Sequence, residues 1–186
     1  MEITEHFDAY LVTNGQYRKK TADVLAVATA LGCTGAINGE PETRTLVKRC
    51  EGVVTEERLL IDKMNMTFRG HMPVGVLRDV FGLTDKGLVT GVYGYGKSSI
   101  AGKGNLTFEV KDMYEENTKL IAFPNISWTG GMTVNLENGL DEVAEVEVTF
   151  SALADENGFF YYETFEKTVT GWTKEFTSEL VAPPTI

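Results

Sequence analysis

The chain has 186 residues, of which 42% are hydrophobic and 24% charged, a composition that excludes a disordered chain. Its 17 Lys and Arg residues face 27 Asp and Glu residues, and the net charge of −10 lies mostly in the C-terminal half. An acidic chain lacks the cationic footprint of nucleic-acid binders, so tight DNA or RNA binding is disfavoured. No segment reaches the roughly 20 apolar residues of a membrane-spanning helix, and the acidic N-terminus predicts no signal peptide.

Two short runs rich in strand-forming residues, Phe7–Val12 and Val24–Cys33, come first in the chain and predict β-strands. A polar segment of mixed charge follows over about residues 35–58, and it contains several glycines and a proline. We expect a long loop there. Loops of this length are uncommon in compact domains and are usually functional or disordered.

The next segments predict one strand and one helix. Apolar and polar side chains alternate through Leu59–Gly70, which is typical of a strand with one buried face. Pro73 then supplies a first-turn proline, and Val76, Leu77, Val80 and Phe81 form an apolar stripe at helical spacing. Gly82 stands where a glycine commonly ends a helix, so we expect an α-helix over about residues 73–82.

A glycine-rich segment, Gly91–Ser98, matches the phosphate-binding pattern G-x-x-x-x-G-K-[ST] letter for letter. That motif binds phosphate only when the loop leads into a helix, whose N-terminal N–H groups point at the anion. Here an alternating strand begins at Asn105, which leaves no room for the helix. We therefore interpret the segment as an inter-strand loop, although Lys97 keeps a nucleotide-dependent enzyme open as an alternative.

The remainder of the chain is rich in strands. The predicted runs are Gly87–Tyr95, Asn105–Met113, Leu120–Phe123, Ile126–Val134, Leu140–Leu153 and Phe159–Phe165. Turns are expected at Asn157-Gly158 and over residues 137–139. The last residues, about 166–186, alternate weakly and contain a Pro-Pro pair, so we expect a C-terminal arm.

Strands in runs with one short helix predict a mainly β protein, an antiparallel sandwich or barrel-like sheet with one flanking helix. Alternating strand–helix units are missing from the sequence, so a parallel nucleotide-binding sheet is not expected. The length suits a single domain, residues 1–186, that carries the long loop and the C-terminal arm.

The sequence offers little catalytic chemistry. His6 and His71 form no ligand pair at metal spacing, and we expect Cys33 and Cys50 to be two reduced thiols, one of them buried. Glu145 and Glu147 lie on the polar face of one predicted strand, which is typical of a solvated face rather than a catalytic pair. We expect no enzyme activity, cofactor or metal.

Five segments in this order resemble the major tail (tail tube) proteins of long, non-contractile-tailed bacteriophages of Gram-positive hosts. The resemblance covers about residues 60–165. The segments are Ile61–Leu83 (IDKMNMTFRGHMPVGVLRDVFGL), Gly91–Ser99 (GVYGYGKSS), Leu120–Gly131 (LIAFPNISWTGG), Asn138–Glu147 (NGLDEVAEVE) and Asp155–Phe165 (DENGFFYYETF).

The resemblance implies a tail tube fold and self-assembly into hexameric rings that stack around a tape-measure protein. It implies further partners, a tail-tip initiator and a tail terminator, and placement in the virion after assembly in the host cytoplasm. DNA would pass through the tube without specific binding, and no membrane would be involved.

Two sets of residues gain a role in this setting. Stacked rings need head-to-tail contacts, and the loop at 35–58 is our candidate for them. Its charged residues are Glu40, Arg44, Lys48, Arg49 and Glu51. An acidic lumen would repel DNA phosphates, and the candidate lumen residues are Glu109, Lys111, Glu145 and Glu147. The alternative is a β-sandwich binding or adhesion module of a virion or cell surface.

Overall fold

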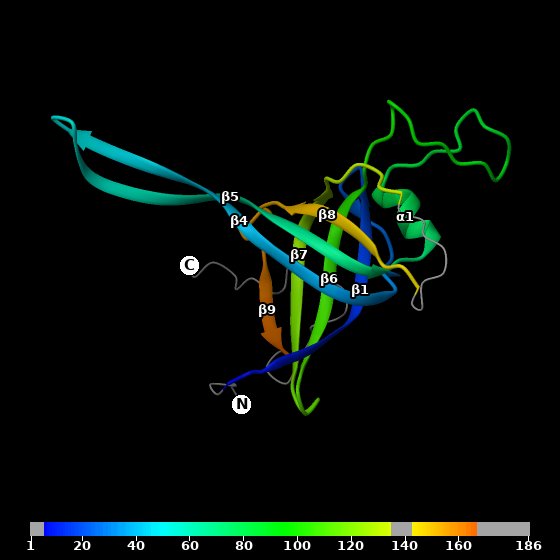
Figure 1. Cartoon of the computed structure of the whole chain (residues 1–186), viewed down its shortest axis with the longest axis horizontal. Helices are drawn as coiled ribbons and strands as arrows, with labels where there is room; N and C mark the ends of the chain where they lie inside the picture. The colour runs from blue at the N-terminus through cyan, green and yellow to red at the C-terminus, as the bar shows by residue number, and fades with distance from the viewer. Residues whose placement is uncertain (1–5, 135–142, 167–186) are drawn as a thin grey trace, which may run out of the picture.

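The structure is a computed structural model that describes residues 6–134 and 143–166. These residues form strands and one helix (Figure 1). The elements are β1 (Ala9–Thr21), β2 (Val24–Leu25), β3 (Thr29–Ala30), β4 (Cys33–Cys50), β5 (Val53–His71), α1 (Val74–Val80), β6 (Lys103–Asp112), β7 (Thr118–Trp128), β8 (Val146–Ala152) and β9 (Tyr162–Phe165).

The strands form one antiparallel sheet in the order β2-β1-β6-β7-β8-β5-β4, with β3 also paired to β1 and β9 to β7. The sheet curls so that Cα atoms of β1 and β4 come within 8 Å of each other. No ladder joins these two strands in the described part of the chain, so the sheet is not closed. The predicted mainly β, antiparallel fold with one helix is confirmed.

Strand β7 changes partner halfway along one edge. Its first half pairs with β9 and its second half pairs with β8, while β6 lies along the other edge. Pro124 stands between the halves, where a residue without an N–H leaves no ladder bond unmade. The two predicted runs Leu120–Phe123 and Ile126–Val134 are therefore one strand that ends at Trp128.

Large aromatic rings fill the core under the curl of the sheet. Phe68 and Phe108 stack with centroids 6.3 Å apart, and Phe150 meets both Phe123 and Trp128 edge to face at 5.6 and 5.4 Å. All five side chains are buried. Edge-to-face and offset contacts of this kind add to the stabilisation that burial of the rings supplies.

Helix α1 covers one end of the core, where Val76 and Val80 are buried. Pro73, expected in the first turn, instead stands just before the helix as its N-cap, with φ −60° and ψ 143°. Gly82 ends it at φ +66°, donating to the carbonyl of Asp79, and Leu83 donates to the carbonyl of Arg78. This pair of bonds is the Schellman arrangement, which satisfies the last carbonyls of the helix. The predicted helix over 73–82 is confirmed.

The predicted turn at Asn157-Gly158 is organised by one carboxylate. Asp155 Oδ1 accepts the backbone N–H groups of Asn157 and Phe159, both at 2.9 Å, and Oδ2 accepts the Tyr162 hydroxyl at 2.5 Å. Burial of Asp155 would raise the pKa of its carboxyl, but these hydrogen bonds outweigh burial and lower it. Burial and the bond to Asp155 raise the pKa of Tyr162 to about 12.

This turn predicts an acid-dependent contribution to stability. Because the pKa of Asp155 is lower in the folded chain than in the unfolded chain, its contribution is present above about pH 4 and is lost as pH falls further. We expect Asp155→Asn to lower the melting temperature at pH 7, and the difference from wild type to shrink between pH 4 and pH 2.5. Thermal melts across this range measure it. The neighbouring change Glu156→Gln is the control, and a difference that does not depend on pH would contradict the prediction.

Three expectations about strands and thiols are wrong. Residues 87–95, expected as a strand, form turns and coil with one isolated bridge, because three glycines interrupt the apolar residues there. The run Val24–Cys33 holds only the two-residue strands β2 and β3 before β4 begins. Cys33 and Cys50, of which one was expected to be buried, are both exposed free thiols. They stand at the two ends of β4, an edge strand of the sheet.

Candidate assembly surfaces

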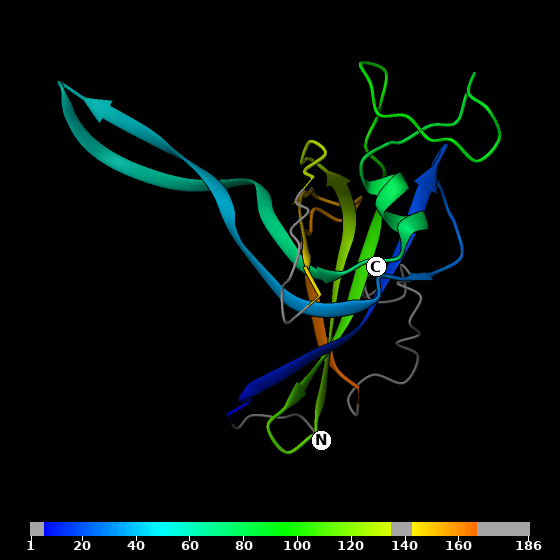
Figure 2. The ribbon, with the colours of Figure 1, turned by 45° about the vertical axis from the view of Figure 1, so that its right-hand side comes forward.

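The segment expected as a loop over residues 35–58 is a β-hairpin. Strands β4 and β5 pair from Cys33 and His71 to Cys50 and Val53, and the ribbon projects far beyond the body of the molecule (Figures 1 and 2). Glu51 and Gly52 close it with φ values of +50° and +85°. Two successive positive φ values are typical of a type I′ turn, whose twist suits a two-residue hairpin.

Ion pairs fix the register of the projecting ribbon. Arg44 lies 3.1 Å from Asp62, Lys48 lies 3.2 Å from Glu56, and Lys63 lies 3.2 Å from Glu42. Hydrogen bonding from Asn65 and the Lys63 pair lower the pKa of Glu42. Each pair is exposed and contributes little stability alone, but together they favour this pairing over a slipped one.

One face of the hairpin continues the surface that the sheet turns toward the core. Phe68 and Met66 are buried on this face, and farther out it carries apolar side chains that nothing in the described chain covers. Their exposed fractions are 40% for Val47, 62% for Leu59 and 50% for Ile61. We call these three residues, with Val54, the inner face. Exposed apolar patches of this kind mark interaction sites.

The structure places all five predicted inter-ring residues on the hairpin. Glu40, Arg44, Lys48 and Arg49 lie along β4, and Glu51 lies in the turn. All are exposed. Arg44 and Lys48 have partners within the hairpin, whereas no ion pair engages Arg49 or Glu51 in the described part of the chain. Whether they contact another ring stays a prediction.

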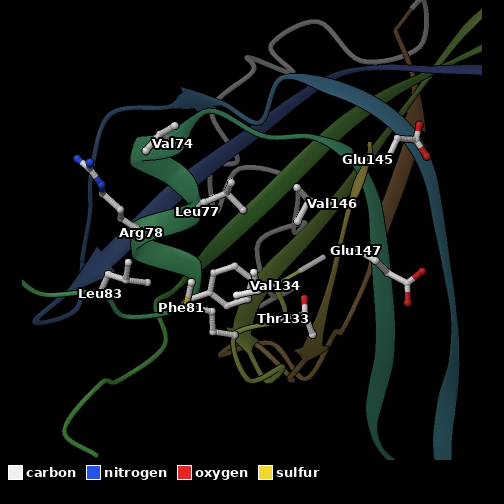
Figure 3. Close-up of a pocket in the computed structure, with 11 residues that line it drawn as sticks. Val74, Leu77, Arg78, Phe81, Leu83, Thr133, Val134, Glu145, Val146 and Glu147 are labelled. Atoms are coloured by element: carbon white, nitrogen blue, oxygen red, sulfur yellow. The ribbon is translucent and has the colours of Figure 1, made fainter. Parts of the chain in front are cut away.

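A groove runs between α1 and the start of β8 (Figure 3). Its volume is about 590 Å³, within the range of ligand-sized sites. Apolar side chains line most of it, with Arg78 at the helix rim and Glu145 and Glu147 at the strand rim. The apolar residues are Val74, Leu77, Phe81, Leu83, Met132, Val134 and Val146.

The predicted lumen residues fall into two separate places. Glu109 and Lys111 lie on β6 opposite the beginning of β7, whereas Glu147 lies beyond the far end of β7, beside β5. Glu109 accepts a hydrogen bond from Asn14 at 2.6 Å, Lys111 pairs with Glu115 at 3.0 Å, and Glu145 pairs with Arg69 at 2.6 Å. These residues therefore form two local clusters, and their exposure to a lumen stays a prediction.

The phosphate-loop lookalike, residues 91–98, lies in the irregular connection between α1 and β6. The next regular element is strand β6 from Lys103, so the helix that a phosphate site needs does not follow it, as predicted. The connection rests on the helix, where the guanidinium of Arg78 lies 3.7 Å from the ring centroid of Tyr93. A contact at this distance is a cation–π interaction.

Other site chemistry is sparse. Across residues 6–134 and 143–166, no group of three or more His, Cys, Asp and Glu side chains could hold a metal ion. In the same residues no helix has the length and hydrophobicity to cross a membrane. The predicted C-terminal arm, apart from Glu166, and the predicted turn at 137–139 lie outside the described residues.

No family model matches the sequence, and no curated protein matches it. Among solved structures, the chain is similar to the tube-terminating cap of the anti-feeding prophage, determined by cryo-electron microscopy. The similarity has a TM-score of 0.47 at 11% sequence identity and covers 88% of this chain and 99% of that chain.

Two surfaces were not predicted from the sequence. The apolar residues of the inner face of the hairpin lie in a segment that is polar on average. A detectable signal was Glu51-Gly52, a turn pair followed by the β-branched residues Val53, Val54 and Thr55. The groove joins residues about seventy positions apart, such as Val74 and Val146, and no local pattern could have found it.

Proposed function

We propose that this chain is a structural protein of a phage tail that assembles with copies of itself into stacked, hexameric rings forming a tube. The observation that carries the proposal is the β4–β5 hairpin, which projects from the body with uncovered apolar residues and unpaired strand edges. In a monomer such a ribbon would leave its strand edges and apolar side chains exposed, which is an aggregation hazard. In an assembly the same ribbon can reach a neighbouring subunit and bind it.

The order of the tail-tube segments supports the proposal from the sequence side. Four of the segments fall on the half of β5 nearest the body and on α1, on the connection after α1, on β7, and on the turn and strand at β9. The described end of the remaining segment, residues 143–147, leads into β8. They are packing and turn elements, which is what a protein without a catalytic centre needs. We propose accordingly that the chain performs no catalysis and binds no cofactor.

Stacked rings also give the negative charge a use. A channel lined with carboxylates repels DNA phosphates, and confinement between low-dielectric walls strengthens the field. Of the two candidate clusters, the one at Glu145 and Glu147 is partly neutralised by Arg69, and the one at Glu109 and Lys111 is partly neutralised by its own lysine. The proposed partners are a tape-measure protein inside the tube, a tail-tip initiator and a tail terminator.

Electron microscopy of the concentrated, purified protein tests this function. We expect rings or tubes of uniform width, and more of them when a tail-tip initiator and a tape-measure protein are added. Sedimentation velocity on the same samples gives the size of the assemblies. A chain that stays solitary under all these conditions would overturn the proposal and favour the binding or adhesion module.

A further inference from the structure

The hairpin and the groove beside α1 are two apolar surfaces that residues 6–134 and 143–166 leave uncovered. The inner face of the hairpin presents Val47, Leu59 and Ile61 to solvent. The groove presents an apolar floor and a volume of about 590 Å³, enough for several aliphatic side chains but not for a whole ribbon. Covering either surface would remove apolar area from water, which is the main favourable term in protein association.

The two surfaces lie on opposite sides of the molecule. In both views the hairpin leads away from the body on the side opposite α1 (Figures 1 and 2). The hairpin of a chain therefore does not cover the groove of the same chain. A pair of complementary patches on different sides of a subunit makes a head-to-tail contact, and such contacts repeat to give rings or filaments.

The charges beside the two surfaces are also complementary. Strand pairing places Glu57 and Arg49 on the same side of the ribbon as the inner face, next to Val47 and Val54. No ion pair engages either charge within the described chain. The groove has a cationic rim at Arg78 and an anionic rim at Glu145 and Glu147, of which Glu145 is paired with Arg69 (Figure 3). Each surface thus offers groups of both signs beside apolar residues, which favours one docking direction.

We propose that the groove between α1 and β8 of one copy receives the inner face of the β4–β5 hairpin of another copy. The contact buries Val47, Leu59 and Ile61 against the apolar floor and sets Arg49 beside Glu147. The inference rests on the proposed self-assembly and names the surface that the hairpin contacts. The partner is a second copy of this chain, since both halves of the contact are present in every copy.

Cysteine cross-linking tests the contact in the full-length chain. In a Cys33→Ser/Cys50→Ser background, Val47→Cys marks the inner face and Val74→Cys marks the groove. With a short bismaleimide, we expect the variant that carries both to give a ladder of dimers, trimers and longer products. Each single variant alone should give none, and a mixture of the two single variants should stop at dimers.

A matched control and three outcomes make this decisive. Val47→Cys combined with Val27→Cys, an exposed valine between β2 and β3, should give no ladder. Dimers from Val47→Cys alone would mean that hairpins pair with each other, and would overturn the inference. Tubes seen by microscopy without a ladder would overturn it and leave the proposed function standing. A ladder without rings or tubes would support the contact and overturn the proposed function.

A charge exchange tests the same contact without cysteines. Arg49→Glu alone and Glu147→Arg alone should each reduce the amount of sedimenting assembly by about tenfold, since each sets like charges together at the contact. The double variant restores the opposite-charge pair, so assembly should recover most of that loss. Equal loss in the single variants and no recovery in the double variant would contradict the contact.

Discussion

We expect a chain whose hairpin is cut short to fold normally and, on the proposed function, to form no tubes. The variant replaces Thr43–Asp62 with Asn-Gly, which joins Glu42 to Lys63 by a two-residue turn. These two residues face each other in the ladder and form an ion pair at 3.2 Å, so the shortened strands stay in register. None of the removed residues is buried, and only Leu60 is partly covered.

Because the core is untouched, we expect the melting temperature to change by only a few degrees and the variant to elute as a monomer. Electron microscopy should show no tubes at concentrations where we expect the wild type to form them. Point variants show which face of the hairpin makes the contact. The inner-face variant Val47→Ser/Leu59→Ser should also form no tubes. Leu46→Ser/Val53→Ser, equally exposed on the opposite face, should still form tubes. Tubes of normal length from the shortened chain would refute an assembly role for the hairpin.

The largest loss of stability is expected from Phe108→Ala. The ring is 1% exposed and lies against Phe68, and the backbone of Gly15 closes over it so tightly that a Cβ there would come within 2.9 Å. Neighbours held this closely cannot collapse into the space that the ring leaves. We therefore expect a loss of about 3–5 kcal/mol, a large share of the roughly 5–15 kcal/mol that stabilises a typical domain.

For a chain of this size the loss corresponds to a melting temperature lower by about 6–20 °C. Thermal and urea unfolding followed by circular dichroism measure it. Phe159→Ala is the matched control, because that ring is 50% exposed and packs in a tilted arrangement against Tyr162, with the ring centroids 5.3 Å apart. If both variants lose the same stability, the core does not depend on Phe108 as described.

The sequence predicted elements whose two faces differ. Strand β8 alternates between buried Val148 and Phe150 and exposed Glu147 and Thr149, and that contrast was visible without a structure. Helix α1 was equally predictable, because a proline precedes and a glycine follows a stripe of four apolar residues. An element that is buried on one side has apolar residues at regular intervals in its sequence. This periodicity is what allows such elements to be predicted.

The hairpin leaves no such trace, since both of its faces meet water in a single chain. Its charged residues pair across the strands, and partners away from the turn, such as Arg44 and Asp62, are separated by many positions in the sequence. The groove could not be predicted from the sequence for a different reason. It exists only where α1 and β8 meet, and their juxtaposition depends on the whole sheet.

The chain order of these parts bears on when polymerisation can start. The hairpin pairs residues that are close in sequence near Gly52, and local hairpins form in about 1–10 μs. The body forms more slowly, since β1 must wait for β6, whose Glu109 lies 95 positions after Asn14. Strand β8, one wall of the groove, is synthesised later still. A nascent chain thus exposes its hairpin before it has a groove to offer, so on the proposed contact it can join a growing end but cannot be extended until β8 has been synthesised.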